Sequence, residues 1–290
     1  MIRLGTRGSA LALAQARLVA QQLPVEAEIV PIKTSGDRGP GGDKARFVKE
    51  IEEALLAGEV QLAVHSAKDV PAELPEGLAI VGVPERADPR DAICGAASVD
   101  ELPEGAVVGT SSLRRRAQLL AARPDLEVRE LRGNVDTRLR KLAEGEYDAL
   151  VLASAGLVRL GRAGEGSPIP SELLTPAPGQ GCLALEARAG DEETSAAAAA
   201  LTDRAALVCL TAERALVAAL DASCRTPVGA HASLADGRLE LAAFVGLPDG
   251  SEWVRDALVG DSDDPAALGD EVAGRMMAAG GSGILATLVD

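Results

Sequence analysis

The sequence predicts an α/β protein with two similar lobes, followed by a small α+β region. In the first half of the chain, apolar runs of strand length alternate with segments of helical spacing, which is the pattern of mostly parallel sheets. One sequence pattern recurs in both lobes: Gly58 and Gly145 each end a helical segment, and each precedes a buried strand. Towards the C-terminus the pattern changes to a long amphipathic helix and short alternating strands.

The first lobe is expected to begin with a strand, a helix and a second strand. The glycine-rich segment that follows, including Gly36 to Lys44, predicts a loop. A helix and a buried strand complete this part of the pattern. The expected strands are 2–6, 27–32 and 60–64, and the expected helices are 10–23 and 47–56.

The second lobe repeats this scheme, and the C-terminal region departs from it. Strands are expected at 107–108 and 126–131, with helices at 113–122 and 135–143. A helix over 204–220 follows, capped by Thr202 or Asp203. Asp236-Gly237 and Asp249-Gly250 predict hairpin turns, and a helix over 265–279 precedes a last strand at 284–288.

Composition excludes several classes of function. The formal net charge is -15 and aromatic residues make up only 1%, so nucleic acid and anionic membranes are not expected partners. No apolar run reaches the roughly 18 residues that span a membrane, and no signal peptide is recognisable. Four scattered cysteines and two histidines predict neither a metal site nor a disulfide framework. We expect a cytoplasmic protein.

Hydroxyls and arginines gather where strands turn into helices. The segment Thr110-Ser111-Ser112-Leu113-Arg114-Arg115-Arg116 is the clearest case. Nearly the same residue types occur in Thr6-Arg7-Gly8-Ser9 and in the segment from Arg132 to Arg138. Helix N-termini favour anions, and arginine adds permanently charged donors that match carboxylate and phosphate. In open α/β sheets such turns face a crevice, which predicts an anion-binding cleft between the lobes. The alternative is that the arginines form a solvated helix face.

Asp69 is a candidate catalytic group. It follows a buried strand, and Pro71 restricts the loop after it to extended conformations. In a cationic cleft its carboxylate could stabilise developing positive charge or move a proton. The plainer alternative is a turn carboxylate paired with a neighbouring lysine at the surface.

Cys224 is a candidate covalent attachment point. It lies in a polar loop beside Arg225 and near a helix end, which favours exposure and partial thiolate character. The alternative is a small buried hydrophobic residue. The other cysteines, Cys94, Cys182 and Cys209, lie in more apolar surroundings and are expected to be structural.

Several phrases of this chain, from residue 3 to about residue 258, resemble the porphobilinogen deaminase family in their order and content. They are Leu4-Gly5-Thr6-Arg7-Gly8-Ser9, His65-Ser66-Ala67-Lys68-Asp69-Val70-Pro71, Asp88-Pro89-Arg90-Asp91-Ala92, Gly109-Thr110-Ser111-Ser112-Leu113-Arg114-Arg115, Leu131-Arg132-Gly133-Asn134-Val135 through Arg138, Pro178-Gly179-Gln180-Gly181, and Cys224 before Pro227-Val228-Gly229.

The resemblance implies a fold and a reaction. The two lobes would be similar to type II periplasmic binding proteins, with domains at 1–84 plus 178–201, 85–177 and 202–290. The protein would be a monomeric transferase that condenses four porphobilinogen molecules head to tail, releasing ammonia each time. The primer would be a dipyrromethane cofactor attached through a thioether to Cys224, and hydrolysis would release hydroxymethylbilane.

The resemblance also implies roles for individual residues. Asp69 would be the catalytic carboxylate, and no metal would be required. Carboxylate groups of the cofactor would be bound by Ser66, Lys68, Thr110, Ser111, Ser112, Arg114 and Arg115. Substrate and growing chain would be bound by Arg7, Ser9, Arg132, Arg138 and Gln180. A non-catalytic two-lobed protein that binds a carboxylate or phosphate is the alternative function, and it would need neither Cys224 nor Asp69.

Overall fold

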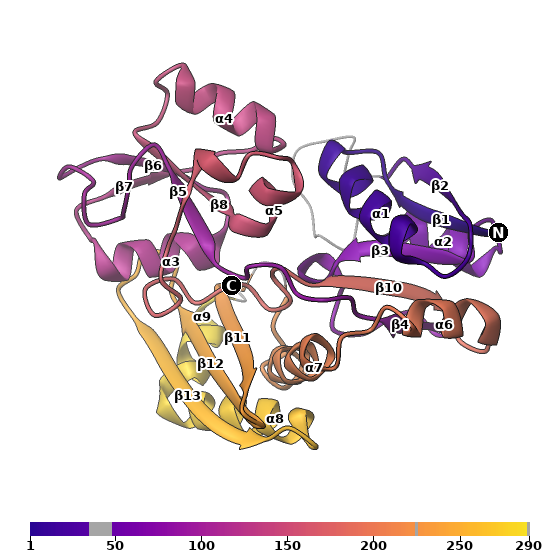
Figure 1. Cartoon of the computed structure of the whole chain (residues 1–290). Coiled ribbons are helices and arrows are strands. Elements are labelled where there is room, and N and C mark those ends of the chain that lie inside the picture. Colours follow the sequence, from indigo (N-terminus) through magenta and orange to yellow (C-terminus); the bar gives the residue numbers. More distant parts are fainter. Residues whose placement is uncertain (35–47, 224–225, 289–290) are drawn as a thin grey trace.

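The computed structural model describes residues 1–34, 48–223 and 226–288, and the chain forms three sheets with covering helices (Figure 1). The first lobe has a five-stranded sheet of order β2-β1-β3-β10-β4. Strands β1, β2 and β3 are parallel, whereas β10 is antiparallel to both its neighbours. Its elements are β1 (Ile2–Arg7), α1 (Ala10–Gln22), β2 (Ala27–Ile32), α2 (Lys49–Leu56), β3 (Leu62–Ser66), the short 3-10 helix η3 (Ala67–Asp69), β4 (Leu78–Gly82), β10 (Leu183–Arg188) and α6 (Glu192–Ala199).

The second lobe has a five-stranded sheet of order β7-β6-β8-β5-β9. Here β6, β7 and β8 are parallel and β5 is antiparallel to its neighbours. The elements are β5 (Asp91–Cys94), β6 (Val107–Gly109), α3 (Leu113–Ala122), β7 (Glu127–Arg129), α4 (Val135–Ala143), β8 (Ala149–Ala153), α5 (Ser154–Arg159), the 3-10 turn η4 (Ala163–Glu165) and β9 (Ser167–Pro168).

The two lobes share one topology, which confirms the predicted repeat. In each, the antiparallel strand is the first that the chain forms after crossing from the other lobe: β5 after the first crossing and β10 after the second. Gly58 and Gly145 end the corresponding helices with φ of 73° and 76°, a conformation that glycine adopts without strain. The carboxyl ends of the parallel strands carry the turns that the sequence singles out.

The third unit is a three-stranded antiparallel sheet packed on helices, so the predicted α+β region is confirmed. Asp203 caps its first helix by accepting a hydrogen bond from the Ala206 N–H at 2.7 Å. Both predicted hairpin turns are present. The elements are α7 (Arg204–Ala219), β11 (Val228–Ala235), β12 (Arg238–Gly246), β13 (Trp253–Asp261), α8 (Pro265–Met276), the π-helical turn η5 (Met277–Gly281) and α9 (Ser282–Thr287).

The expected C-terminal strand at 284–288 is wrong, because Ser282–Thr287 forms helix α9. Gly280, with φ of 112°, turns the chain without ending the helical run. Ile284 then packs one face of α9 against the core beneath α7 and α8. A short apolar run fits a buried helix as well as a strand, and only its packing partner separates the two.

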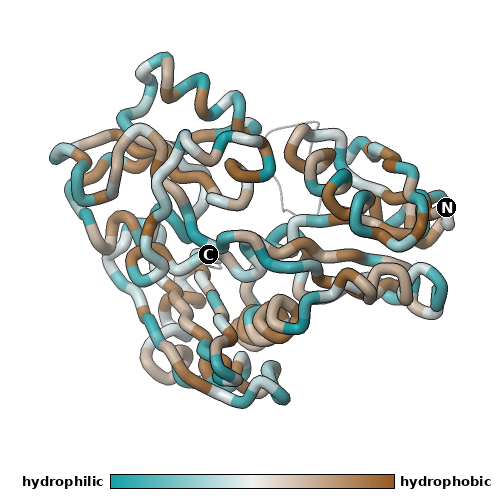
Figure 2. The backbone as a smooth tube through the Cα atoms, viewed as in Figure 1, coloured by the Kyte–Doolittle hydropathy of each residue, from teal (hydrophilic) through white to brown (hydrophobic). Residues whose placement is uncertain are grey.

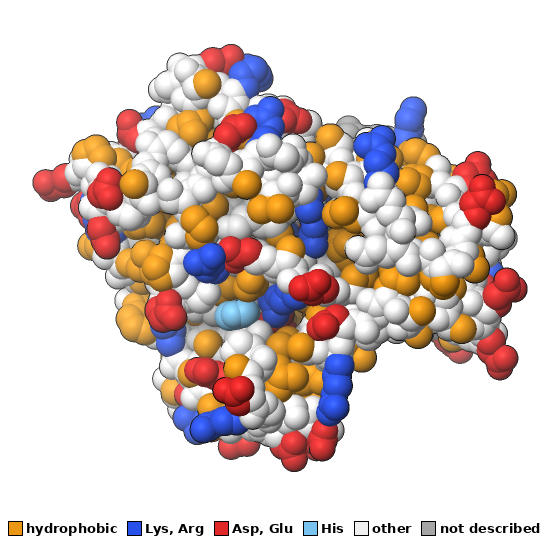
Figure 3. Space-filling model, viewed as in Figure 1, with side chains coloured by type: hydrophobic (Ala, Val, Ile, Leu, Met, Phe, Trp, Pro, Cys, Tyr) orange, Lys and Arg blue, Asp and Glu red, His pale blue; other side chains and the backbone are white. Residues whose placement is uncertain are grey.

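The three predicted domain ranges each contain one sheet, and we propose them as the domains. Hydrophobic residues follow the strands and the inward helix faces, while the outer turns are hydrophilic (Figure 2). On the face shown in Figure 3, acidic and basic side chains are interspersed over all three units. No single described helix is long and apolar enough to cross a membrane; only α6 and α7 together pass that test, and they are bent by 109°.

Two crossing segments connect the lobes and lie against one another. The Arg86 guanidinium donates to the Gln180 carbonyl at 3.0 Å, and the Ala87 N–H donates to the Gly181 carbonyl at 3.3 Å. Gly181 has φ of 89°, and a Cβ there would lie 2.3 Å from the Ala87 carbonyl oxygen. Glycine is therefore required by both conformation and close approach.

The buried carboxylate of Glu213 on α7 ties the third unit to these crossings. It accepts from the Arg86 guanidinium at 2.6 Å, the Gly179 N–H at 2.6 Å and the Ala232 N–H at 2.7 Å. Its side chain is 0% exposed and that of Arg86 is 11% exposed. Burial alone would raise the pKa of Glu213, but the charge and hydrogen bonds of Arg86 keep it below its ordinary value.

Replacing Glu213 with Ala should lower the free energy of unfolding by about 3–5 kcal/mol, because Arg86 is left buried without its counterion. Urea denaturation measures the change. Glu240→Ala on the exposed side of β12 is the matched control. A loss no greater than that of the control would contradict the structural role of Glu213.

Candidate functional site

Two cavities meet at Asp69. The larger, of about 240 Å³, is lined by residues of both lobes and the third unit, among them Lys68, Ser112, Arg114 and Ser223. The smaller, of about 60 Å³, is lined by first-lobe residues that include Arg7, Ser9 and Ser66. Asp69 lines both. A carboxylate at this junction can act on groups held in either cavity.

Local structure places Asp69 at the carboxyl end of β3. The parallel strand ends at Ser66, and the single 3-10 turn η3 follows, with the Val70 N–H bonded to the Ala67 carbonyl at 3.2 Å. Pro71 cannot continue a helix, so the chain leaves the turn extended at Val70. The carboxylate therefore lies on a defined turn rather than on a long loop.

Serine side chains cap the helices that border the cavities. Ser9 caps α1 by accepting from the Ala12 N–H at 3.3 Å, and Ser112 caps α3 by accepting from the Arg115 N–H at 3.4 Å. Thr110, at the end of β6, accepts from the Ser112 N–H at 3.2 Å. Both cavities therefore adjoin a helix N-terminus, where the helix dipole favours negative charge.

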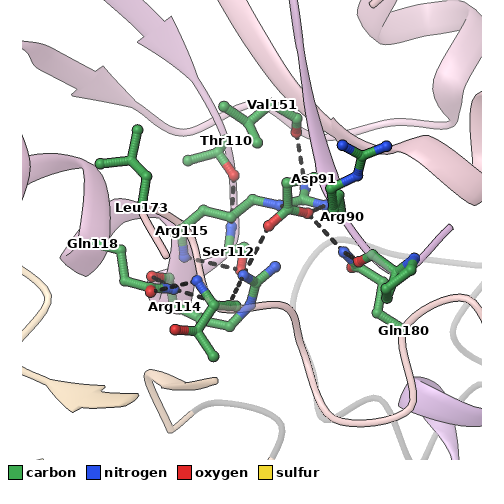
Figure 4. A network of polar contacts seen from close by, with 12 residues as sticks. Arg90, Asp91, Thr110, Ser112, Arg114, Arg115, Gln118, Val151, Leu173 and Gln180 are labelled. Atoms are coloured by element: carbon green, nitrogen blue, oxygen red, sulfur yellow. Dashed lines mark hydrogen bonds and ion pairs between the residues drawn. The ribbon is translucent and has the colours of Figure 1, made fainter. Parts of the chain in front are cut away.

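Asp91 holds the two arginines that follow Ser112 (Figure 4). Its carboxylate lies 2.8 Å from the Arg114 guanidinium and 2.7 Å from that of Arg115. All three side chains are buried. Burial alone would raise the pKa of Asp91, but the two guanidinium charges hold it well below its ordinary value. The group therefore carries a net positive charge behind the α3 N-terminus.

Gln180 joins this charged group to the first lobe. Its amide nitrogen donates to Asp91 at 2.9 Å and to the Pro89 carbonyl at 2.7 Å, while its amide oxygen accepts from the Lys68 ammonium at 3.1 Å. The chain of contacts runs from Lys68, beside Asp69, across the second crossing to the arginines of α3. The two lobes thus share one hydrogen-bonded network at the cleft.

The structure brings some predicted site residues to the cavities and leaves others away from them. Thr110, Arg115 and Gln180 are buried behind the cavity walls, and Ser111 is exposed. Arg132 is exposed and paired with Glu130 at 2.6 Å. The predicted site residues that do line one of the two cavities are Arg7, Ser9, Ser66, Lys68, Asp69, Ser112 and Arg114.

The solvated-face interpretation of the arginine run is wrong. Arg114 and Arg115 are 5% and 6% exposed, and Arg116 donates to the carbonyls of Val128 and Pro248. Arg138 is half-buried and donates to the Gly133 carbonyl at 2.8 Å. Burial lowers the pKa of Arg138 to about 10, with a further contribution from the charge of Arg115. The ligands of these arginines remain predictions.

Cys224 and the segment Gly36–Lys44 lie outside the described residues. The other cysteines are free and buried, as expected. Burial raises the pKa of Cys94 and of Cys209 to about 11 and that of Cys182 to about 12. These three thiols are therefore protonated near neutral pH and are poor nucleophiles. Among the described residues, no group of three or more His, Cys, Asp or Glu side chains could hold a metal ion.

Sequence reasoning missed Asp91 and Glu213 as organising groups. Both left a signal: Asp91 opens an otherwise apolar strand, and Glu213 lies in the apolar stripe of α7 with Cys209 and Leu216. An acidic residue at a core position requires a partner. The sequence could have raised that question, but the partners come from distant segments.

A buried histidine–glutamate pair lies at the wall of the smaller cavity, which His65 lines. The His65 imidazole is 2.9 Å from the Glu186 carboxylate, and their side chains are 3% and 0% exposed. Glu52 on α2 is also buried. Burial, together with the charge of Glu186, raises the pKa of Glu52 to about 7. Protonation of Glu52 therefore occurs near neutral pH and removes one negative charge beside Glu186.

Two α/β lobes with basic residues and one shared carboxylate at their cavities are typical of a protein that binds an anionic ligand. Comparison with known proteins narrows this class. The family model for the dipyrromethane cofactor-binding domain of porphobilinogen deaminase matches residues 2–196, and the model for its C-terminal domain matches residues 207–278. The chain belongs to the porphobilinogen deaminase family of enzymes, which confirms the resemblance and the dipyrromethane cofactor.

Relatives match over nearly their whole length. The porphobilinogen deaminase of Thermus thermophilus is 49% identical over 299 residues, covering 99% of each chain. That of Brevibacillus brevis is 45% identical, covering 99% of this chain and 97% of the relative. That of Paracoccus denitrificans is 50% identical, covering 94% and 92%. A periplasmic substrate-binding protein of Coxiella burnetii is 16% identical with a TM-score of 0.43, covering 71% of this chain and 94% of that chain.

Replacing Glu52 with Gln should change the pH dependence of stability. With a folded pKa of about 7 against an ordinary value of 4.5, the folded chain holds this proton between those pH values and the unfolded chain does not. The contribution of this proton to the free energy of unfolding is fully present below pH 4.5 and is lost as the pH rises through 7. The melting temperature of Glu52→Gln should therefore exceed that of wild type by a larger margin at pH 8 than at pH 5.

Melting curves at both pH values measure this effect, with Glu59→Gln at an exposed position as the control. Equal differences from wild type at the two pH values would show that Glu52 titrates normally.

Proposed function

We propose that this chain is a cytoplasmic, monomeric transferase that condenses four porphobilinogen molecules head to tail, each with loss of ammonia. The condensation uses a dipyrromethane primer attached to Cys224, and hydrolysis then releases hydroxymethylbilane. The observation that carries the proposal is that Asp69 lines both cavities. One cavity borders Ser223, next to the proposed attachment residue, and the other is a first-lobe pocket for an incoming unit.

The residues of the larger cavity fit a dipyrromethane bearing carboxylates. Lys68 and Arg114 give its wall positive charge, and Ser112 presents the N-terminus of α3. Such donors form charge-assisted hydrogen bonds with carboxylates. When bound, the group supplies the free pyrrole end to which substrate is added. Ser66, Thr110, Ser111 and Arg115 complete the proposed cofactor-binding set.

The residues of the smaller cavity suit one substrate molecule. Arg7 and Ser9 lie at the start of α1, where a guanidinium and a helix N-terminus can hold the carboxylates of porphobilinogen. Arg132, Arg138 and Gln180 would bind the lengthening chain. Asp69 would stabilise positive charge on the reacting unit and transfer its proton, since an acidic group at the junction opposes a developing cation.

The non-catalytic binding-module alternative is not favoured. Relatives that are 45–50% identical over nearly their full length are named as deaminases. A net charge of -15 supports the absence of nucleic-acid and anionic-membrane partners. Free thiols at the three described cysteines suit a reducing compartment.

Intact mass spectrometry should show the chain mass plus one dipyrromethane. The adduct should disappear in Cys224→Ala and persist in Cys209→Ala, because the Cys209 thiol is buried and protonated. An active wild-type protein without an adduct would contradict attachment at Cys224.

Asp69→Asn should retain the adduct but lose turnover of porphobilinogen by about 10²- to 10⁴-fold, the usual contribution of general acid–base catalysis. Steady-state assay of ammonia release measures the loss. Asp100→Asn, at an exposed position of the second lobe, should turn over normally. Wild-type rates in Asp69→Asn would remove this carboxylate from the mechanism.

A further inference from the structure

The loop that follows Asp69 is held by a side chain from a different unit. Arg214 of α7 reaches into the first lobe and donates to three consecutive carbonyl oxygens. Its guanidinium nitrogens lie 3.5 Å from the Val70 oxygen, 2.8 Å from that of Pro71 and 2.8 Å from that of Ala72. These contacts fix the backbone immediately after Asp69.

Arginine suits this place for a chemical reason. Its planar guanidinium carries five donors in a rigid fork, so one group can bind carbonyls that point in slightly different directions. Pro71 has no N–H group and cannot join a backbone ladder, so the loop relies on such side-chain contacts. Burial lowers the pKa of Arg214, and the charge of Glu186 opposes that shift. The carbonyls that Arg214 contacts carry no net charge, and the residue also lines the larger cavity.

Helix α7 is a rigid support for this contact. Its Ala212 and Leu216 side chains are fully buried in the core of the third unit. The residue before Arg214 is Glu213, whose carboxylate is bound by Arg86 and by the amides of Gly179 and Ala232. Neighbouring residues of one helix therefore hold the crossings between the lobes and the loop of Asp69.

The same helix leads directly to the proposed attachment residue. α7 ends at Ala219, and shortly after it Ala222 and Ser223 line the larger cavity, as do Lys68 and Asp69. The contact from Arg214 to Pro71 and Ala72 thus links the segment that precedes Cys224 to the loop of the catalytic carboxylate. An apolar cluster that includes Val70 and Leu210 also packs this loop against α7, and the guanidinium adds directed hydrogen bonds to that packing.

We propose that Arg214 is a positioning residue, which holds the Asp69 turn in register with the segment of α7 that leads to Cys224. This inference rests on the proposed function for the roles of Asp69 and Cys224. The guanidinium acts through the backbone of the Asp69 loop, and the substrate is bound by other residues.

Arg214→Met removes the donors while keeping much of the side-chain length, and Arg204→Met is the matched control. Arg204 lies on the same helix, is 77% exposed, and pairs only at the surface with Asp263. We expect kcat to fall about 10- to 100-fold in Arg214→Met, since small misplacements of catalytic groups cost this much. KM should stay within about threefold of wild type, the adduct should be retained, and the acidic limb of the kcat–pH profile should shift.

Hydrogen exchange tests the contact without relying on turnover. Amides of the segment 67–77 should exchange faster in Arg214→Met than in wild type or Arg204→Met, while the strands of the third unit keep their protection. Arg214→Lys should recover part of both kcat and protection, because an ammonium can still donate to one or two of the carbonyls. This variant keeps the test valid should Arg214→Met fold poorly.

Three results would overturn the inference. Turnover and exchange equal to those of Arg204→Met would show that the contact is dispensable. A large increase in KM with kcat unchanged would show that Arg214 binds substrate directly. A loss of kcat that matches a loss of folded protein, with the pH profile unmoved in Arg214→Lys, would show a purely structural role. If wild type itself carries no adduct and does not turn over porphobilinogen, the proposed function fails, while the exchange comparison still tests the contact.

Discussion

The cleft depends on the burial of one carboxylate, Asp91, between two guanidiniums. Arg114 and Arg115 follow the cap of α3 and would repel one another in a buried site without a counterion. Asp91 forms an ion pair with Arg114 and accepts hydrogen bonds from Arg115, and Gln180 adds a neutral hydrogen bond to the same carboxylate. The result is a group with one net positive charge, fixed by short contacts at the base of the second lobe.

This arrangement explains how an acidic chain can bind anions. On the face shown in Figure 3 acidic and basic groups lie side by side, whereas Lys68, Arg114 and Arg214 line the larger cavity. Low exposure strengthens each interaction, because buried charges are screened less by water and salt. Asp69 lines both cavities, and in the proposed mechanism its carboxylate opposes the positive charge that develops on the reacting unit.

The third unit has a structural part in the site as well as a proposed chemical one. Glu213 and Arg214, neighbours on α7, contact the crossings between the lobes and the loop of Asp69 respectively. At this point the first lobe and the third unit meet both through directed hydrogen bonds and through an apolar cluster that includes Val70 of the Asp69 loop and Leu210 of α7. Directed contacts fix angles and distances, which is what a catalytic junction requires.

Local patterns of the sequence determined the alternation of strands and helices, the cap at Asp203, and the motifs that identify the family. These features depend on residues only a few positions apart, so spacing alone reveals them. The tertiary structure decided that residues 282–287 form a helix and which predicted binding residues reach a cavity. It also decided the partners of Asp91, Glu213 and Arg214. In the sequence, Asp91 is 24 residues from Arg115, and Glu213 is 127 residues from Arg86. Arg214 is 143 residues from Pro71. The partner of a buried charged group depends on which distant segment packs beside it, and no local sequence pattern encodes that packing.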